Sequence, residues 1–255
     1  MTKIALVTGA TSGIGDEVVR VFVEQGSKVL ATGRNEPQGE RLVEELGAEC
    51  CAFRSADLCQ PGIADSLVDE TVARFGALHV LVNSAGMIHH ADALETSDDL
   101  WRRHMAINVD ALFYLSRAAV RHMKAHGGGA IVNISSEWGL VGAERAVAYC
   151  ASKGAVVQIT RAMALDHAAD GITVNAVCPG GVDTPMLAAE AERFGMTPAE
   201  ARTHWSAASP NKRIATVRDV AGAVHFLASD AARHINGVAL PVDGGNLARL
   251  SGGCA

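Results

Sequence analysis

Short apolar runs rich in β-branched residues alternate along the chain with longer stretches whose apolar residues recur at helical spacing. Most of the runs are nearly continuous, which is typical of parallel strands covered on both faces. The alternation predicts a single-domain α/β chain, residues 1–255, with a doubly wound parallel sheet of about seven strands flanked by helices. Strands are expected at Ile4–Val7, Lys28–Thr32, Glu49–Phe53, Val80–Val82, Ala130–Ile134, Thr173–Val177 and Val238–Val242, and helices at roughly 13–25, 37–46, 62–75, 98–126, 148–169 and 217–229.

Two helix starts carry capping signals. Ser97 precedes two aspartates at the start of the predicted helix 98–126, and Thr216 with Asp219 forms a capping-box pattern ahead of the final helix. One stretch departs from the regular alternation, because residues 183–215 are polar, helix-prone and contain three prolines. It follows a predicted strand, and loops at the carboxyl ends of parallel strands build ligand sites. We predict a substrate-loop insertion there, with an ordinary surface insertion as the alternative.

The composition indicates an acidic globular chain. With 22 Lys or Arg and 28 Asp or Glu among 255 residues, the net charge is −6, and 49% of the residues are hydrophobic. This balance argues against a nucleic-acid partner, whose phosphates require neutralisation by Lys and Arg. No apolar run approaches the ~18–20 residues of a membrane span, and no export signal precedes the first strand. The six cysteines lack C-x-x-C pairs and metal-ligand spacing, so we expect reduced thiols and a cytoplasmic location.

No metal site is expected either. His122 and His126 lie four residues apart, but no acidic partner or second cluster accompanies them. The end of a surface helix explains this pair better.

A glycine-rich turn joins the first predicted strand to the next helix. In Val7-Thr8-Gly9-Ala10-Thr11-Ser12-Gly13-Ile14-Gly15, three glycines permit a tight turn whose backbone N–H groups can approach an anion. The helix N-terminus adds the positive end of its dipole. A strand before and a helix after the turn are typical of a dinucleotide site, although the spacing is G-x-x-x-G-x-G rather than G-x-G-x-x-G. A plain turn is the alternative.

A tyrosine and a lysine are placed to act together. Tyr149 and Lys153 lie four residues apart in a predicted helix, so both project from one face. An adjacent cation favours phenolate, and we expect it to lower the Tyr149 pKa from its usual value of about 10. Such a phenol suits general acid–base transfer in an alcohol–carbonyl couple. Ser136 stands about 13 residues earlier, at the end of a predicted strand.

Taken together, these features resemble the short-chain dehydrogenase/reductase family from Ile4 to about Gly245. The resemblance implies a Rossmann-type fold and an oxidoreductase that moves a hydride between NAD(P)(H) and a secondary alcohol or ketone. Enoyl reductases of this fold place the lysine further from the tyrosine, which favours a carbonyl or alcohol over a C=C bond. The matching segments are T-G-x-x-x-G-I-G at 8–15, Asp57 after the third strand, N-x-A-G at 83–86, Asn108, the Ser136, Tyr149 and Lys153 set, P-G-G-V-D-T at 179–184 and V-D-G-G at 242–245.

The resemblance implies a role for each matching residue. Tyr149 would exchange the proton with the substrate oxygen, and Lys153 would lower the Tyr149 pKa and hydrogen-bond the nicotinamide ribose. Ser136 would position the substrate oxygen and stabilise developing charge, and Asn108 would hold a water that links Lys153 to solvent. Cofactor contacts are expected from Gly9, Thr11, Ser12, Gly13, Ile14, Gly15, Gly33, Arg34, Asp57, Leu58, Asn83, Ala85, Gly86, Tyr149, Lys153, Pro179, Gly180, Val182 and Thr184.

The end of the second predicted strand bears on the choice between NAD and NADP. Gly33 stands where NAD-dependent members of the family usually carry an aspartate that binds the ribose 2′-hydroxyl, and Arg34 follows. A guanidinium can hold a 2′-phosphate through two hydrogen bonds. NADP(H) is therefore favoured. NAD(H) is the alternative, because Ser12 lacks the second basic contact of some NADP-dependent relatives and Arg34 could instead stack on adenine.

Several residues near the predicted Ser and Tyr are candidates for the substrate pocket. They are His89, His90, Glu137, Trp138 and Met186, with Ile88, Arg145 and Leu187 nearby. Glu137 and the two histidines favour a small polar substrate such as a sugar, a polyol or another hydroxy compound. The alternative is that these polar groups lie on the surface.

Other functions stay open at this point. A non-catalytic nucleotide-sensing Rossmann protein would have no need of all four candidate catalytic residues, and a carbonyl reductase could act on an acyl-chain or steroid-like ketone. A SAM-dependent methyltransferase on a similar sheet would give no reason for the Tyr–Lys pair. The family resemblance also implies a homotetramer, or a homodimer, in which the helices 98–126 and 148–169 pack across subunits.

Overall fold

The computed structural model describes residues 2–193 and 195–248. They contain one parallel sheet of seven strands in the order β3-β2-β1-β4-β5-β6-β7. The order reverses between β1 and β4, and doubly wound sheets bind their ligands at such a switch point. The predicted architecture is therefore confirmed. The strands are β1 (Ile4–Thr8), β2 (Lys28–Gly33), β3 (Cys51–Ser55), β4 (Val80–Asn83), β5 (Gly129–Ile134), β6 (Ile172–Pro179) and β7 (Ala239–Val242).

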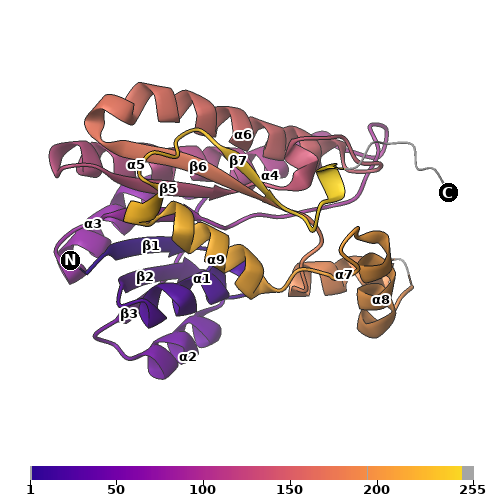
Figure 1. Ribbon diagram of the computed structural model, residues 1–255, viewed down its shortest axis with the longest axis horizontal. Helices are drawn as coiled ribbons and strands as arrows, with labels where there is room; N and C mark the ends of the chain where they lie inside the picture. Colours follow the sequence, from indigo (N-terminus) through magenta and orange to yellow (C-terminus); the bar gives the residue numbers. More distant parts are fainter. Residues whose placement is uncertain (1, 194, 249–255) are drawn as a thin grey trace.

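Helices cover both faces of the sheet (Figure 1). In β1, Ala5 and Val7 belong to an apolar cluster with α1, α2 and α9, whereas Leu6 points to the other face and joins a cluster with α3, α5 and α6. Alternation of side chains along a buried strand produces these two cores. The helices are α1 (Gly13–Glu24), α2 (Glu36–Leu46), α3 (Ile63–Phe75), α4 (Asp98–Met105), α5 (Ala111–Ala125), α6 (Val147–His167), α7 (Pro185–Arg193), α8 (Pro198–Ala208) and α9 (Val217–Leu227).

Local chemistry explains where several elements begin. The predicted caps are confirmed: the Ser97 hydroxyl accepts from Leu100 N–H, and Thr216 and Asp219 form a reciprocal capping box at α9. The prediction for β3 was two residues early. The N–H groups of Cys50 and Cys51 both donate to Gly47 O, at 3.0 and 2.9 Å, so a turn occupies the place where the strand was expected to start.

The predicted helix 98–126 contains a wider turn at its centre. Residues Ala106–Asp110 are π-helical and separate α4 from α5, and Ala111 N–H donates back to Ala106 O. Such single wide turns within α-helices are frequent at functional sites. Here the wide turn carries Asn108, which is 1% exposed.

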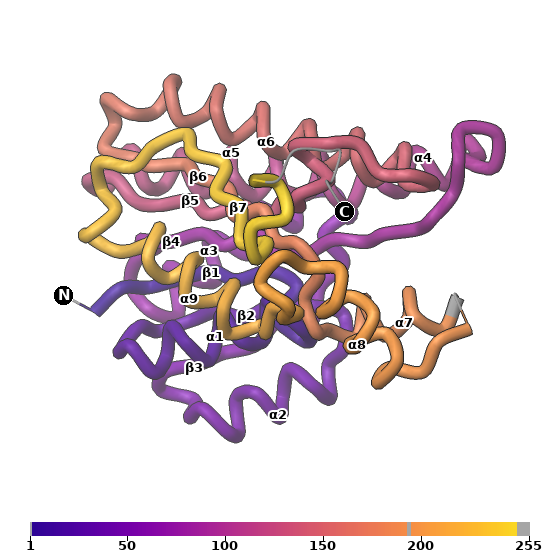
Figure 2. The backbone as a smooth tube through the Cα atoms, turned by 45° about the vertical axis from the view of Figure 1, so that its right-hand side comes forward, coloured from indigo at the N-terminus to yellow at the C-terminus, as the bar shows by residue number. Residues whose placement is uncertain are grey.

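The stretch 183–215 forms two helices, α7 and α8, which lie beyond the carboxyl ends of the strands (Figure 2). Arg202 on α8 donates to Asp183, just after β6, at 2.8 Å, which ties α8 to the sheet. None of the described helices has the length and apolarity to cross a bilayer. The cysteines at 50, 51, 59, 150 and 178 are free thiols, and Cys254 lies outside the described residues.

Candidate active site

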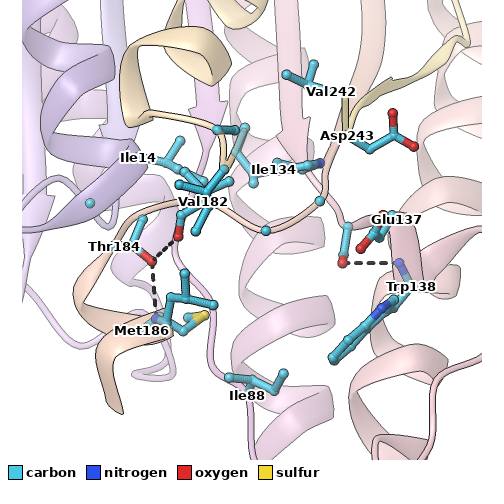
Figure 3. Close-up of a pocket in the computed structure, with 18 of the residues that line it drawn as sticks. Ile14, Ile88, Ile134, Glu137, Trp138, Val182, Thr184, Met186, Val242 and Asp243 are labelled. Carbon is cyan, nitrogen blue, oxygen red and sulfur yellow. Dashed lines mark hydrogen bonds between the residues drawn. The ribbon is translucent and has the colours of Figure 1, made fainter. Parts of the chain in front are cut away.

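A cavity of about 390 Å³ opens at the carboxyl ends of the strands, walled by the turn after β1, the segments after β4, β5 and β6, and the helices α6, α7 and α8. Figure 3 shows part of this wall. The cavity brings together residues that lie far apart in the sequence. The predicted site residues that line it are Gly9, Ser12, Gly13, Ile14, Gly15, Ala85, Gly86, Ser136, Glu137, Trp138, Tyr149, Lys153, Pro179, Gly180, Val182, Thr184 and Met186.

The glycine-rich turn has the shape that a dinucleotide phosphate requires. A Cβ on Gly15 would lie 2.3 Å from Gly9 O, and a Cβ on Gly9 would lie 2.8 Å from Ala85 N, so the backbones pack without side chains between them. Ser12 begins α1 with no side-chain cap, and the first N–H groups of a helix are anion donors. The turn therefore fits a pyrophosphate against the start of α1.

Ser136, Tyr149 and Lys153 converge on this cavity. Tyr149 and Lys153 stand one turn apart on α6 and are 8% and 4% exposed. Lys153 Nζ donates to Ile134 O at 2.9 Å and lies 5.7 Å from the centroid of the Tyr149 ring. Ser136 follows β5 directly, and its hydroxyl accepts from Trp138 N–H at 3.2 Å (Figure 3). The expected Ser–Tyr–Lys group is thus assembled in space.

The pKa of Tyr149 moves in the direction opposite to the one expected from its spacing to Lys153. Burial raises the pKa of Tyr149 to about 12, although a hydrogen bond with Ser136 opposes this, and the charges of Glu190 and Glu137 raise it further. Burial also lowers the pKa of Lys153 to about 8. Loss of water destabilises both charged forms, and the sequence pattern carried no information on this burial. Both groups hold their protons at neutral pH.

Asn108 connects three parts of the site. Its amide oxygen accepts from Met87 N–H at 2.8 Å, and its amide nitrogen donates to Met87 O and to Ser152 Oγ on α6, both at 2.9 Å. A Cβ on Gly86 would lie 3.3 Å from Lys153 Nζ and 3.4 Å from Asn108 Oδ1, so both atoms flank this glycine. The wide turn between α4 and α5 thereby fixes the segment after β4 against α6.

Asn83 takes a different place from the one predicted. Its side chain turns into the protein interior, where it donates to Ser116 Oγ and Asn133 Oδ1 at 3.0 and 2.9 Å. Asn133 then donates to Thr160 Oγ1 on α6 at 2.9 Å. These buried amides join β4 and β5 to α5 and α6. Asn83 therefore supports the site from inside the core and does not line the cavity.

The residues expected to hold the adenosine half of the cofactor lie outside this cavity, at the ends of β2 and β3. Arg34 and Asp57 are exposed, and Leu58 follows Asp57. A Cβ on Gly33 would lie 2.7 Å from the Thr11 side chain, so an aspartate at this position would collide with Thr11. The glycine thus has a packing reason as well as a bearing on the choice of cofactor.

The substrate side of the cavity differs in part from the prediction. Figure 3 shows Trp138 and Met186 on opposite sides with Ile88 between them, and Asn246 donates to Glu137 at 2.9 Å. His89 and His90 do not line the cavity, although both were expected in the pocket. The His89 N–H donates to the buried His104 ring, and the His90 ring packs edge to face against Trp138 with the centroids 5.9 Å apart. Arg145 is exposed and forms an ion pair with Glu95.

The cavity wall also contains residues that were not predicted, and among them are three with polar or aromatic side chains on the insertion or after β7. Glu190 and Trp205 belong to the two helices of the insertion, and Asn246 follows β7. Glu190 lies four residues after Met186, so helical periodicity within 183–215 would have placed both on one face. Trp205 and Asn246 have no comparable signal in the sequence.

Comparisons with known proteins agree with this geometry. A family model described as "Enoyl-(Acyl carrier protein) reductase" matches residues 9–246. The chain is 42% identical over 243 residues to galactitol 2-dehydrogenase (L-tagatose-forming) of Cereibacter sphaeroides, covering 94% of this chain and 93% of the relative. It is 39% identical over 246 residues to cis-4-hydroxycyclohexanecarboxylate dehydrogenase of Sinomonas cyclohexanicum, covering 95% and 96%.

A solved structure supports the cofactor class. An actinorhodin polyketide ketoreductase variant with NADPH superposes with a TM-score of 0.91 and 36% identity, covering 96% of this chain and 97% of that one. The family match spans nearly the whole chain, and both relatives named above are dehydrogenases. The chain therefore belongs to the short-chain dehydrogenase/reductase family and is an NAD(P)-dependent oxidoreductase.

Proposed function

We propose that the protein interconverts a small secondary alcohol and its ketone, with Ser136, Tyr149 and Lys153 at the reacting end of the cavity. The convergence of these three side chains on one cavity with the glycine-rich turn carries the proposal. The spacing of four residues between Tyr149 and Lys153 favours an alcohol or carbonyl substrate, despite the enoyl reductase in the description of the family model.

When bound, a nicotinamide dinucleotide would supply or accept the hydride, and the residues of the site would handle the proton. Tyr149 holds its proton at neutral pH because burial raises its pKa to about 12, so it is poised to donate to a carbonyl oxygen. The Ser136 hydroxyl positions that oxygen. Lys153 holds an ammonium beside Tyr149 and would donate to the ribose of a bound nicotinamide nucleotide. Asn108 holds the surrounding backbone, and a water held by it would link Lys153 to solvent.

A substrate screen with a matched variant tests this function. NADP⁺ and NAD⁺ reduction is followed at 340 nm across neutral polyols, diols, hydroxy acids and steroid alcohols, with wild type and Ser136→Ala. We expect wild type to oxidise at least one secondary alcohol and the variant to lose about 10²-fold or more in kcat. Absence of turnover with every alcohol, or an unchanged rate in Ser136→Ala, would contradict the proposal.

NADP(H) is the preferred dinucleotide in this proposal. Arg34 is exposed at the end of β2, where a 2′-phosphate would lie, and Thr11 fills the space that an aspartate at position 33 would need. Charge-assisted hydrogen bonds contribute about 1.5–3 kcal/mol. Arg34→Asp should therefore lower the NADP-over-NAD preference in kcat/KM by about tenfold or more. An unchanged preference would show that Arg34 does not bind the phosphate.

We also propose that the protein forms a homotetramer. The cytoplasmic location stays a prediction. Large apolar side chains are exposed on the helices that were expected to pack across subunits. Trp101 on α4 is 40% exposed, Phe113 and Tyr114 on α5 are 38% and 46% exposed, and Leu165 on α6 is 82% exposed. Light scattering coupled to size-exclusion chromatography should give four times the mass of the 26.5 kDa chain. A monomer at micromolar concentration would contradict the assembly.

A further inference from the structure

The segment after β4 reaches the substrate side of the cavity through alternate residues. Ile88 lines the cavity, between Trp138 and Met186 (Figure 3). His90, two residues further on, packs edge to face against Trp138. The Trp138 ring in turn meets the Tyr149 ring, with the centroids 6.0 Å apart. The course of this segment therefore sets the wall of the cavity beside Tyr149.

Hydrogen bonds hold the residues on either side of Ile88. Asn108 holds Met87 at both its N–H and its carbonyl, at 2.8 and 2.9 Å. His104 on α4, four residues before Asn108, accepts from His89 N–H through its Nε2 at 3.2 Å. Helix α4 and the wide turn after it thus fix the backbone before and after the residue that lines the cavity.

The two partners of His104 define its tautomer. His104 is 0% exposed, and its Nδ1 lies 2.9 Å from Leu100 O. A carbonyl can only accept, so Nδ1 carries the proton and Nε2 is the acceptor that His89 N–H requires. A second proton on Nε2 would face that N–H. The imidazole therefore links the backbone of α4 to the segment after β4 through both of its nitrogens.

Loss of this imidazole would act on the substrate side of the cavity more than on the cofactor side. His89 N–H would lose its acceptor on α4, whereas Asn108 would still hold Met87. A Cβ on Gly86 would lie 3.3 Å from Lys153 Nζ, so the part of the segment that Asn108 holds is the part beside the lysine. Residues 88–90, which form the wall beside Tyr149, follow it.

We propose that His104 is a positioning residue for the substrate, because it holds the backbone at His89. It thereby sets the place of Ile88 in the cavity and of the His90 ring against Trp138. His104 is not among the described residues that line the cavity, so it acts through this segment and not by touching substrate. This inference rests on the proposed function of the cavity as an alcohol site.

Three variants separate positioning from stability. His104→Leu removes the acceptor, and His104→Gln restores one, because its amide oxygen can accept from His89 N–H. His79→Leu is the matched control. His79 also accepts a backbone N–H, that of Ile4 at 3.0 Å, but it precedes β4, at the opposite end of the strands from the cavity.

Steady-state kinetics with an alcohol that the wild type oxidises give the first readout. We expect His104→Leu to raise KM about fivefold or more, with kcat within about threefold and NADPH binding within about twofold. His104→Gln should return KM to within about twofold of wild type, and His79→Leu should leave KM unchanged. An unchanged KM in His104→Leu, equal increases in His104→Leu and His79→Leu, or no recovery in His104→Gln would overturn the inference.

Amide hydrogen exchange of the wild type, resolved to single residues, gives a second readout that needs neither a variant nor a substrate. His89 N–H should be protected to within about tenfold of Met87 N–H, because both donate to side chains of buried residues. Exchange of His89 N–H at the rate of an unprotected amide would overturn the inference. If wild type oxidises no secondary alcohol at all, the proposed function fails, and this exchange rate still decides whether His104 holds the segment.

Discussion

Replacing Lys153 by methionine should make the protein more stable at neutral pH. Lys153 is 4% exposed, and burial lowers the pKa of its ammonium from 10.5 to about 8. At 1.36 kcal/mol for each unit of pKa, this corresponds to about 3 kcal/mol of destabilisation while the lysine is charged. Methionine removes that cost and also the hydrogen bond to Ile134 O, worth about 1 kcal/mol. We therefore expect Lys153→Met to raise the free energy of unfolding by about 2 kcal/mol at pH 7 and to lose activity.

The pH dependence of this stability difference identifies the buried ammonium of Lys153 as its cause. Between pH 8 and 10.5 the unfolded lysine keeps its proton whereas the folded one loses it, so the unfolded state binds more protons and the wild type gains stability as pH rises. The advantage of Lys153→Met should shrink by about 1.4 kcal/mol per pH unit in this window.

Urea unfolding at pH 7 and pH 9.5, at one protein concentration, measures this change. Because all other groups are shared, the difference between the two proteins isolates residue 153. Lys28→Met, at an exposed position, controls for the change of net charge. The reasoning would be refuted if Lys153→Met and the wild type differed in free energy of unfolding by the same amount at both pH values. It would also be refuted if the wild type were the more stable protein at pH 7.

Two further changes test the fold around the site. Gly15→Ala places a Cβ 2.3 Å from Gly9 O, so we expect it to weaken NADPH binding at least about tenfold in a fluorescence titration. Unchanged binding would show that the turn does not carry the phosphates. Thr216→Ala removes the capping box with Asp219, so we expect the free energy of unfolding in urea to fall by about 1 kcal/mol while kcat stays unchanged. A variant as stable as the wild type would show that this cap contributes nothing.

The sheet and most of the site could be predicted because their determinants are local. Continuous apolar runs mark buried parallel strands, and the four-residue spacing of Tyr149 and Lys153 places both on one face of α6. The carboxyl ends of parallel strands meet at one edge, so Ser136 after β5 could be expected beside them. These inferences require no knowledge of which helices pack against each other.

Tertiary contacts limited the remaining predictions. The direction of the Tyr149 pKa depends on burial, which neighbouring elements create, and the sequence showed only the nearby lysine. His90 was expected in the pocket because it follows β4, but Trp138 lies between it and Tyr149. Glu190 was missed because no helix was assigned within 183–215, although its spacing of four residues from Met186 would have placed both on one helix face.

The most direct test of the account is the single-turnover rate of Tyr149→Phe. The phenyl ring keeps the packing against Trp138 and removes only the hydroxyl that holds the proton. With an alcohol that the wild type oxidises, we predict that the rate of NADPH formation falls by about 10²–10⁴-fold while NADPH binding stays within about threefold. A variant that retains more than about a tenth of the wild-type rate would contradict the assignment of Tyr149 as the proton-transferring group.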